Sequence, residues 1–262
     1  MRNIKLTLSY DGTDFAGWQI QPGRRTVQET LETAIAKVTQ EKVRCNVSGR
    51  TDAGVHALGQ VVNFYTGTTL PAERLLRAIN ANLPSDVVIR RAEDVPQAFD
   101  ANHDARGKWY RYYIHIGEIR PVFLRRYVWH IPWHLDVLKM QRASQPLLGR
   151  HDFRSFETEW PNRMSSVRNI TYLEWRQRGP LIWLDIAADG FLYNMVRAIV
   201  GTLLNVGRGY WPEERVAEIL RAQDRRLAGP TAPPQGLFLM HVWYDGEPSI
   251  NSDETFPILL AD

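Results

Sequence analysis

The sequence is poor in cysteine and has no long apolar run, and each absence excludes a class of protein. One cysteine in 262 residues cannot form an intramolecular disulfide or a cysteine-based zinc site. The most apolar stretch, residues 191–207, contains Arg197 and is too short for a membrane span. The first residues enter a strand-like pattern directly, without the apolar block of a signal peptide. We therefore expect a cytoplasmic protein without a membrane segment.

Lysine is also scarce, since only 5 of the 32 basic residues are Lys and the rest are Arg. The net charge is +3, but residues 103–178 alone carry a net charge of +7. Arg matches phosphates and stacked bases better than Lys does, so this basic region favours a nucleic-acid ligand. An Arg-rich genome would give the same composition, and charge alone leaves both interpretations open.

The predicted elements follow a β-α-β-β-α-β order that occurs twice, which is the ferredoxin-like arrangement. In the first half we expect strands at 4–10, 43–47, 60–65 and 87–91, and helices at 27–38, behind a Thr26 capping box, and 71–79. In the second half we expect strands at 109–116, 170–176, 181–187 and 237–244, and helices at 135–148, 191–206 and 212–223. The fold class is therefore α+β, with two RRM-like halves, residues 1–103 and 104–262. We expect mainly antiparallel sheets and a cleft between the halves.

A loop after the second predicted strand holds Arg50, Asp52 and His56 around two glycines. The simplest interpretation is a turn in which Asp52 bonds its own backbone and Gly54 takes a positive φ angle. The Lys-Ser/Thr pair of a phosphate-binding loop is missing. A suitable cation elsewhere in the chain would make Asp52 a functional carboxylate instead.

Arg197 is that candidate cation. Apolar residues occupy nearly every side of its predicted helix, and a buried Arg requires an anion. Asp52 is the preferred partner, with Asp185 and Asp189 as alternatives, unless the side chain reaches the surface along its aliphatic stem. An ion pair with Arg197 would keep Asp52 ionised and fix its orientation.

The strand that starts at Lys108 alternates aromatic and basic residues. Tyr110 and Tyr112 should lie on one face, and Trp109, Arg111 and Tyr113 on the other. Such rings either stack on an unpaired base or form the aromatic side of a β core.

Two further features suggest less chemistry. His130 and His134 have the i,i+4 spacing of helical metal ligands, but Pro132 between them argues against a helix. We therefore expect no metal site. Cys45 lies within a predicted strand, where we expect a buried thiol.

Several short motifs together resemble the TruA family of tRNA pseudouridine synthases. In chain order, the matching segments are 10–12, 17–19, 49–57, 110–112, 151–153, 155–156, 194–197 and 236–237. The run Arg-Thr-Asp-Ala-Gly-Val-His at 50–56 is highly specific, whereas each of the other segments is weak alone.

The resemblance implies that the protein converts uridine to pseudouridine in the anticodon arm of tRNA, at positions 38, 39 and 40, without a cofactor or metal. It implies that Asp52 is the nucleophile, that Arg197 pairs with it, and that Tyr110 contacts the target base. Arg50 and Thr51 would bind the substrate, with Arg50 on a phosphate or on the flipped nucleotide. The family resemblance also implies a homodimer that holds tRNA across both subunits.

The residues leave chemical alternatives open. A carboxylate can add to C6 of uracil or to C1′ of ribose, or it can remove the proton at C2′. A different hypothesis is a non-catalytic RNA-binding protein of two RRM-like halves, although the aromatic signature of RRM strands is missing. A third is a two-carboxylate nucleoside hydrolase, for which no clear second acid is present.

Overall fold

The described part of the computed structural model, residues 1–158, 165–246 and 250, is an α+β protein built on one ten-stranded, mostly antiparallel sheet. The strand order is β4-β1-β3-β10-β5-β9-β8-β7, with β2 beside β3 and β6 beside β5. The pairs β3–β10 and β5–β6 are parallel. Within these residues, no helix has the length and hydrophobicity needed to cross a membrane.

The first half contributes four strands and two helices. They are β1 (Arg2–Tyr10), α1 (Val27–Thr39), β2 (Asn46–Val47), β3 (His56–Thr66), α2 (Ala72–Asn80) and β4 (Val87–Val95). The predicted capping residue is confirmed, because the Thr26 hydroxyl accepts from the backbone N–H of Glu29 at 3.4 Å. The predicted strand at 43–47 is wrong in length. Its Cys45 N–H donates to the Glu32 side chain instead of a neighbouring strand.

Within its described residues, the second half contributes six strands and three α-helices. They are β5 (Gly107–Ile116), β6 (Trp129–Ile131), α3 (Val137–Ser144), β7 (Gly149–Asp152), β8 (Val167–Arg178), β9 (Leu181–Ala188), α4 (Met195–Gly207), α5 (Arg215–Ala222) and β10 (Leu237–Trp243). The helix predicted from residue 191 begins only at Met195, because Asn194 takes the left-handed conformation with φ 62°. The predicted hairpin at 170–187 is confirmed as the antiparallel pair β8–β9.

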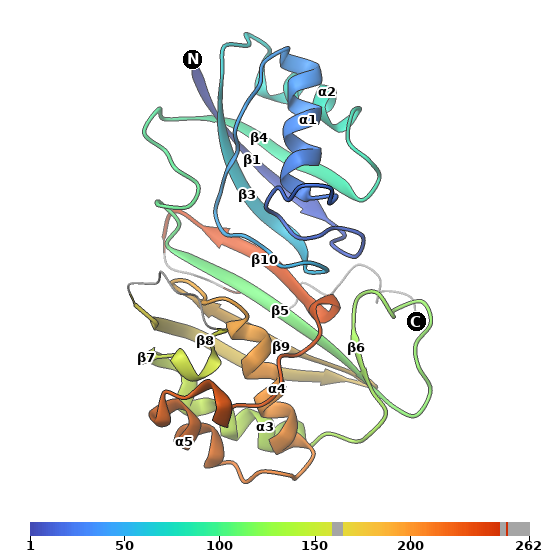
Figure 1. Cartoon of the computed structure of the whole chain (residues 1–262), viewed down its shortest axis with the longest axis vertical. Coiled ribbons are helices and arrows are strands. Elements are labelled where there is room, and N and C mark those ends of the chain that lie inside the picture. Colours follow the sequence, from blue (N-terminus) through green and yellow to red (C-terminus); the bar gives the residue numbers. More distant parts are fainter. Residues whose placement is uncertain (159–164, 247–249, 251–262) are drawn as a thin grey trace.

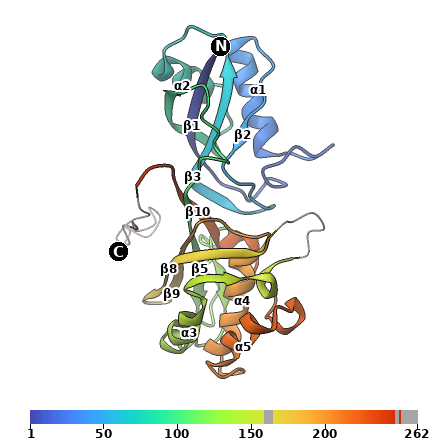
Figure 2. The same cartoon turned by 90° about the vertical axis from the view of Figure 1, so that its left-hand side faces the viewer.

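The last strand joins the two halves. β10 pairs antiparallel with β5 and parallel with β3, where Phe238 lies opposite His56 and Leu239 opposite Ala57. Figures 1 and 2 show β10 at the junction, with α1 and α2 in one half and α3, α4 and α5 in the other. A strand from the end of the chain therefore fixes the start of β3, directly after the loop that carries Asp52.

The aromatic strand has the two faces that were predicted. Tyr110 and Tyr112 belong to the main core, while Trp109 and Tyr113 pack in a second cluster on the opposite face. On that opposite face Arg111 makes a buried ion pair with Asp185, with Nε 2.6 Å from Oδ1. Asp185 is thereby excluded as the partner of Arg197.

Helix α4 is held unusually close to the segment that precedes β10. A Cβ on Gly201 would lie 1.7 Å from the carbonyl oxygen of Pro230. We expect Gly201→Ala to destabilise the protein by about 1–3 kcal/mol, although Ala is the better helix former, because backbone atoms must move apart. Urea unfolding measures the effect. Gly190→Ala is the matched control, since its Cβ would meet nothing closer than 3.5 Å. Equal stability of the two variants would contradict this packing argument.

Candidate active site

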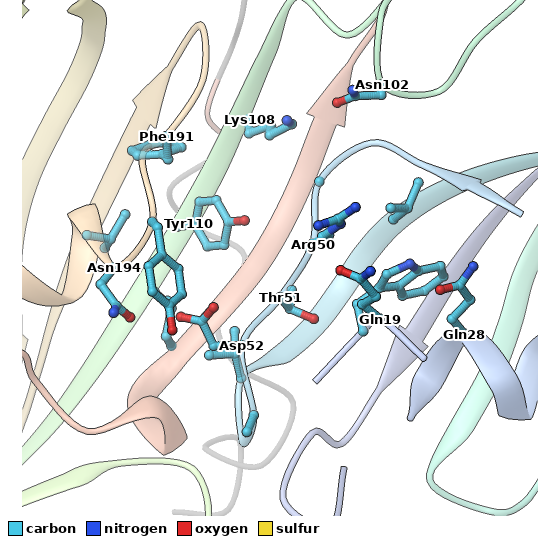
Figure 3. Close-up of a pocket in the computed structure, with 18 of the residues that line it drawn as sticks. Gln19, Gln28, Arg50, Thr51, Asp52, Asn102, Lys108, Tyr110, Phe191 and Asn194 are labelled. Atoms are coloured by element: carbon cyan, nitrogen blue, oxygen red, sulfur yellow. The ribbon is translucent and has the colours of Figure 1, made fainter. Parts of the chain in front are cut away.

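A pocket of about 1020 Å³ lies between the two halves and is lined by residues of both. From the first half come the segment 16–28 and the loop 49–55, which we call the Asp52 loop; from the second come β5 and the segment 191–197. Figure 3 shows Asp52, Tyr110, Phe191 and Asn194 in one part of the pocket. The cleft expected between the halves is therefore present, and its volume is at the upper end for small-molecule sites.

Two glycines let the segment after β1 pack directly on the Asp52 loop. A Cβ on Gly12 would lie 2.0 Å from the Val55 carbonyl oxygen, and one on Gly17 2.8 Å from that of Thr51. Gly17 also has a backbone φ of 94°, which residues other than glycine rarely adopt. The Trp18 N–H donates to the Thr51 carbonyl at 3.0 Å. The motifs at 10–12 and 17–19 therefore pack against the backbone of the Asp52 loop and help to fix its position.

Asp52 forms an ion pair with Arg197 across the two halves. Arg197 Nη1 donates to Asp52 Oδ2 at 3.2 Å. The side chain of Arg197 is 15% exposed and that of Asp52 is 27% exposed. Arg197 therefore does not extend to the surface. The other rival, Asp189, accepts from the Asn169 N–H instead. The pairing predicted from an apolar helix and a distant loop is therefore present.

Two further contacts fix the direction of the Arg197 guanidinium. Nη1 also donates to Asn194 Oδ1 at 2.6 Å, and Nε donates to the Ala232 carbonyl at 2.7 Å. The left-handed backbone of Asn194 places its amide one turn before the arginine. Because three acceptors hold two of the guanidinium nitrogens, the side chain of Arg197 has a fixed direction at the wall of the pocket.

Burial changes the expected charge balance of Asp52. Desolvation raises the pKa of the carboxyl above its ordinary value, and the opposing effect of Arg197 is smaller. Arg197 acts in the predicted direction, because it favours the ionised form of Asp52, but burial outweighs its effect on the pKa. Arg197 limits the rise in pKa, and without it the carboxylate would be harder still to ionise.

Tyr110 lies on the pocket side of β5 and is buried. Its ring meets Phe191 edge-on, with 5.1 Å between ring centroids. Burial raises the pKa of its hydroxyl, and the charges of Tyr10 and Asp52 add to this effect. The hydroxyl therefore keeps its proton at neutral pH and can act as a hydrogen-bond donor beside the carboxylate.

Arg50 and Thr51, which were also predicted to bind the substrate, differ in their exposure. Arg50 is exposed at the pocket, and no acidic side chain pairs with it in the part of the chain that the structure describes. The Thr51 hydroxyl is buried and lies 2.8 Å from the Tyr10 hydroxyl, which also accepts from the Gln60 amide. This bond makes Thr51 a support of the Asp52 loop, and its contact with substrate stays a prediction.

Among the side chains that line the pocket, sequence reasoning missed the positions of Asn194 and Lys108. Asn194 was part of a recognised motif, yet its bond to Arg197 depends on a left-handed residue inside an apolar, helix-like run. Lys108 was considered only as part of an aromatic strand. Its position two residues before Tyr110 places it on the same face of β5, which was the available signal.

Asp52 and Arg197 both lie in parts of the chain that match a known protein family. The model of one family, described as tRNA pseudouridine synthase, matches residues 7–104 and 143–245, which include both Asp52 and Arg197. The chain belongs to the tRNA pseudouridine synthase family. The family match therefore spans both halves and both partners of the ion pair.

Similar curated proteins cover nearly the whole chain. A protein of Anoxybacillus flavithermus named tRNA pseudouridine synthase A is 48% identical over 246 residues, 94% of this chain and all of the relative. One of the same name from Acetivibrio thermocellus is 44% identical over 244 residues, 93% of this chain and all of the relative. Among solved structures, an archaeal box H/ACA sRNP Nop10–Cbf5 complex matches with a TM-score of 0.33 and 14% identity, over 77% of this chain and 44% of that one.

Proposed function

We propose that this family member converts uridine to pseudouridine in the anticodon arm of tRNA, at positions 38, 39 and 40, with Asp52 as the nucleophile. The single observation that carries the assignment is the Asp52–Arg197 ion pair at 3.2 Å in a pocket between the halves. The names of the relatives support tRNA as the substrate. The choice of Asp52 rests on the geometry of the pocket.

The reaction is an isomerisation with no net oxidation or reduction. The bond between N1 and C1′ breaks, the uracil rotates, and C5 bonds to C1′; C5 then loses its proton while N1 gains one. A carboxylate beside the base can add to C6 or to C1′, or remove the proton at C2′. A primary isotope effect from deuterium at C2′ would identify the last route.

The side chains around Asp52 divide the remaining work. Tyr110 and Phe191 present ring surfaces against which a flipped base can pack, which offsets the few kcal/mol that unstacking costs. Arg197 orients the carboxylate and limits the rise of its pKa. In this proposal Arg50, at the exposed side of the pocket, contacts the RNA backbone, while Thr51 supports the loop from its buried side.

Release of tritium from uracil C5 tests the proposed reaction. The purified protein should release tritium from an unmodified tRNA transcript labelled at this position, because the new C5–C1′ bond expels the hydrogen. Binding of the tRNA without release would support the rival, a passive RNA-binding protein. Free uracil among the products would support the nucleoside hydrolase. Either result would overturn the proposal.

The pH dependence of the rate should reflect the buried carboxyl. Because burial raises the pKa of Asp52, its ionised form is lost at a higher pH than for an exposed aspartate. We expect the single-turnover rate to fall as the pH drops toward the ordinary Asp range, with a midpoint above the ordinary pKa of 3.8. Single-turnover assays between pH 4 and 8 measure this midpoint. A rate that stays constant down to pH 4 would contradict the role of Asp52.

The proposal includes a homodimer that holds tRNA across both subunits in the reducing cytoplasm, where a single Cys needs no partner. The net charge of +7 over residues 103–178 supports RNA as the ligand of this part of the chain. Light scattering on the purified protein should give twice the mass of the chain. A stable monomer with full activity would contradict the dimer.

We further infer that residues 1–103 and 104–262 form two ferredoxin-like halves. The strand orders β4-β1-β3-β2 and, with the short strands β6 and β7 set aside, β10-β5-β9-β8 support this inference. If the four strands of each half are numbered along the chain, both sheets have the order 4-1-3-2. All neighbouring strands within each of these two orders are antiparallel.

A further inference from the structure

Lys108 lies in the pocket beside the Asp52 loop. Its ammonium is close to the loop backbone, since a Cβ on Gly49 would lie 3.1 Å from Nζ. Among residues 1–158, 165–246 and 250, no carboxylate pairs with Lys108 and no hydrogen-bond acceptor contacts it. Figure 3 shows it next to Tyr110, on the side of the pocket that also holds Arg50 and Asn102.

The charges that face Lys108 are unfavourable for an ammonium ion. Burial and, to a smaller extent, the nearby charge of Arg168 on β8 together lower its pKa to about 8. Arg50 on the Asp52 loop adds another cation to this pocket. Asp100 also lines the pocket, but its Oδ1 accepts from the N–H groups of Asn102 and His103, and Oδ2 from Asn46.

A partly buried cation without a partner costs free energy that the folded protein alone does not recover. An anionic ligand recovers it. Lys108 is two residues from Tyr110 on the same strand face, a separation of about 7 Å. An anion bound there would lie beside a base that packs on Tyr110, which is where the backbone of the same nucleic-acid strand must pass.

We propose that Lys108, together with Arg50, binds a backbone phosphate of the RNA next to the target nucleotide. The assignment rests on the proposed function, because it takes RNA as the ligand of this pocket. It adds a second contact region to the pocket, distinct from the carboxylate and rings around the reacting base. Lys108 thereby positions the strand and does not touch the reacting atoms.

Binding measurements without turnover test this proposal. In an Asp52→Asn background, an unmodified tRNA transcript is titrated with Lys108, Lys108→Met and Lys108→Arg proteins at several salt concentrations. Loss of one phosphate contact should reduce the slope of log affinity against log salt by about 1, and weaken binding about 10-fold at 0.1 M salt. Lys108→Arg should keep most of the affinity and most of the salt dependence. Lys37→Met removes the same charge from an exposed residue of α1 and should change neither.

The pH dependence of binding gives a second readout. A phosphate favours the charged amine, so RNA binding takes up a proton wherever the unbound protein has lost it. Affinity should therefore fall as the pH rises through about 8. The same fall should be absent in Lys108→Arg and Lys108→Met, whose residue 108 does not titrate there. An identical pH dependence in all three proteins would overturn the proposal.

Thermal unfolding separates binding from structure. The folded-state pKa of Lys108 is below that of an unfolded lysine, so the native state holds fewer protons and the charged amine costs stability below about pH 8. Lys108→Met should therefore have an equal or higher Tm at pH 7. A lower Tm, or an unchanged salt slope, would overturn the proposal. Tritium release by the wild-type protein is measured separately, so failure of the proposed function is recognised independently.

Discussion

Asp52→Asn should abolish formation of pseudouridine while leaving the fold and tRNA binding intact. An amide oxygen has nearly the shape of the carboxylate but is a poor nucleophile and a poor base. Removing a nucleophile typically costs about 10⁴-fold or more in turnover. We expect a loss of that size in tritium release from labelled tRNA. A variant with more than a tenth of the wild-type rate would contradict the role of Asp52.

The stability of Asp52→Asn provides its control. The pKa of Asp52 is raised in the folded protein, so the native state binds this proton more tightly than the unfolded chain does. The contribution of this group to stability is present below the unfolded pKa and is lost as the pH rises through the folded pKa. At neutral pH the ionised carboxylate therefore costs stability. The Asn variant should unfold at an equal or higher temperature, so that lost activity cannot be attributed to unfolding.

Arg197→Met should slow the reaction by about 100-fold at neutral pH, the size of effect that small misplacements of catalytic groups produce. Methionine preserves much of the packing of α4 but removes the cation 3.2 Å from Asp52. The carboxyl then loses both its orientation and the interaction that favours its ionised form. Single-turnover rates measured at saturating protein separate this chemical effect from tRNA binding.

Arg225→Met is the matched control for this variant. Arg225 holds the same segment before β10, with donors to the Gly229 carbonyl and the Thr231 hydroxyl at 2.8 and 3.0 Å, but it does not contact Asp52. Loss of packing alone would slow both variants equally. A rate close to wild type in Arg197→Met would contradict the account of the ion pair.

Sequence periodicity predicted most helices and strands, because each depends on which residues face the core within one segment. The pairing of Asp52 with Arg197 was also predictable, since an Arg on an apolar helix needs an anion. The excess length of the helix predicted from residue 191 has a local cause. Asn adopts the left-handed conformation more readily than most residues, but the apolar pattern around Asn194 does not show that it does so here.

Other features depend on contacts between distant segments. The position of β10 between β3 and β5 joins the halves through pairings that no local pattern encodes. The buried Arg111–Asp185 pair arises because β5 and β9 place these residues opposite each other. The raised pKa of Asp52 depends on how deeply the assembled pocket buries it, which outweighs the charge that the sequence did reveal.

The central claim is that Asp52 is a buried carboxylate whose ionisation Arg197 assists, and the titration of its side-chain carbon measures this directly. The ¹³Cγ signal of Asp52, assigned by its loss in Asp52→Asn, should titrate with a pKa above the ordinary value of 3.8. In Arg197→Met the same signal should titrate at a still higher pH. A wild-type pKa at or below 3.8, or the same pKa in both proteins, would contradict the account.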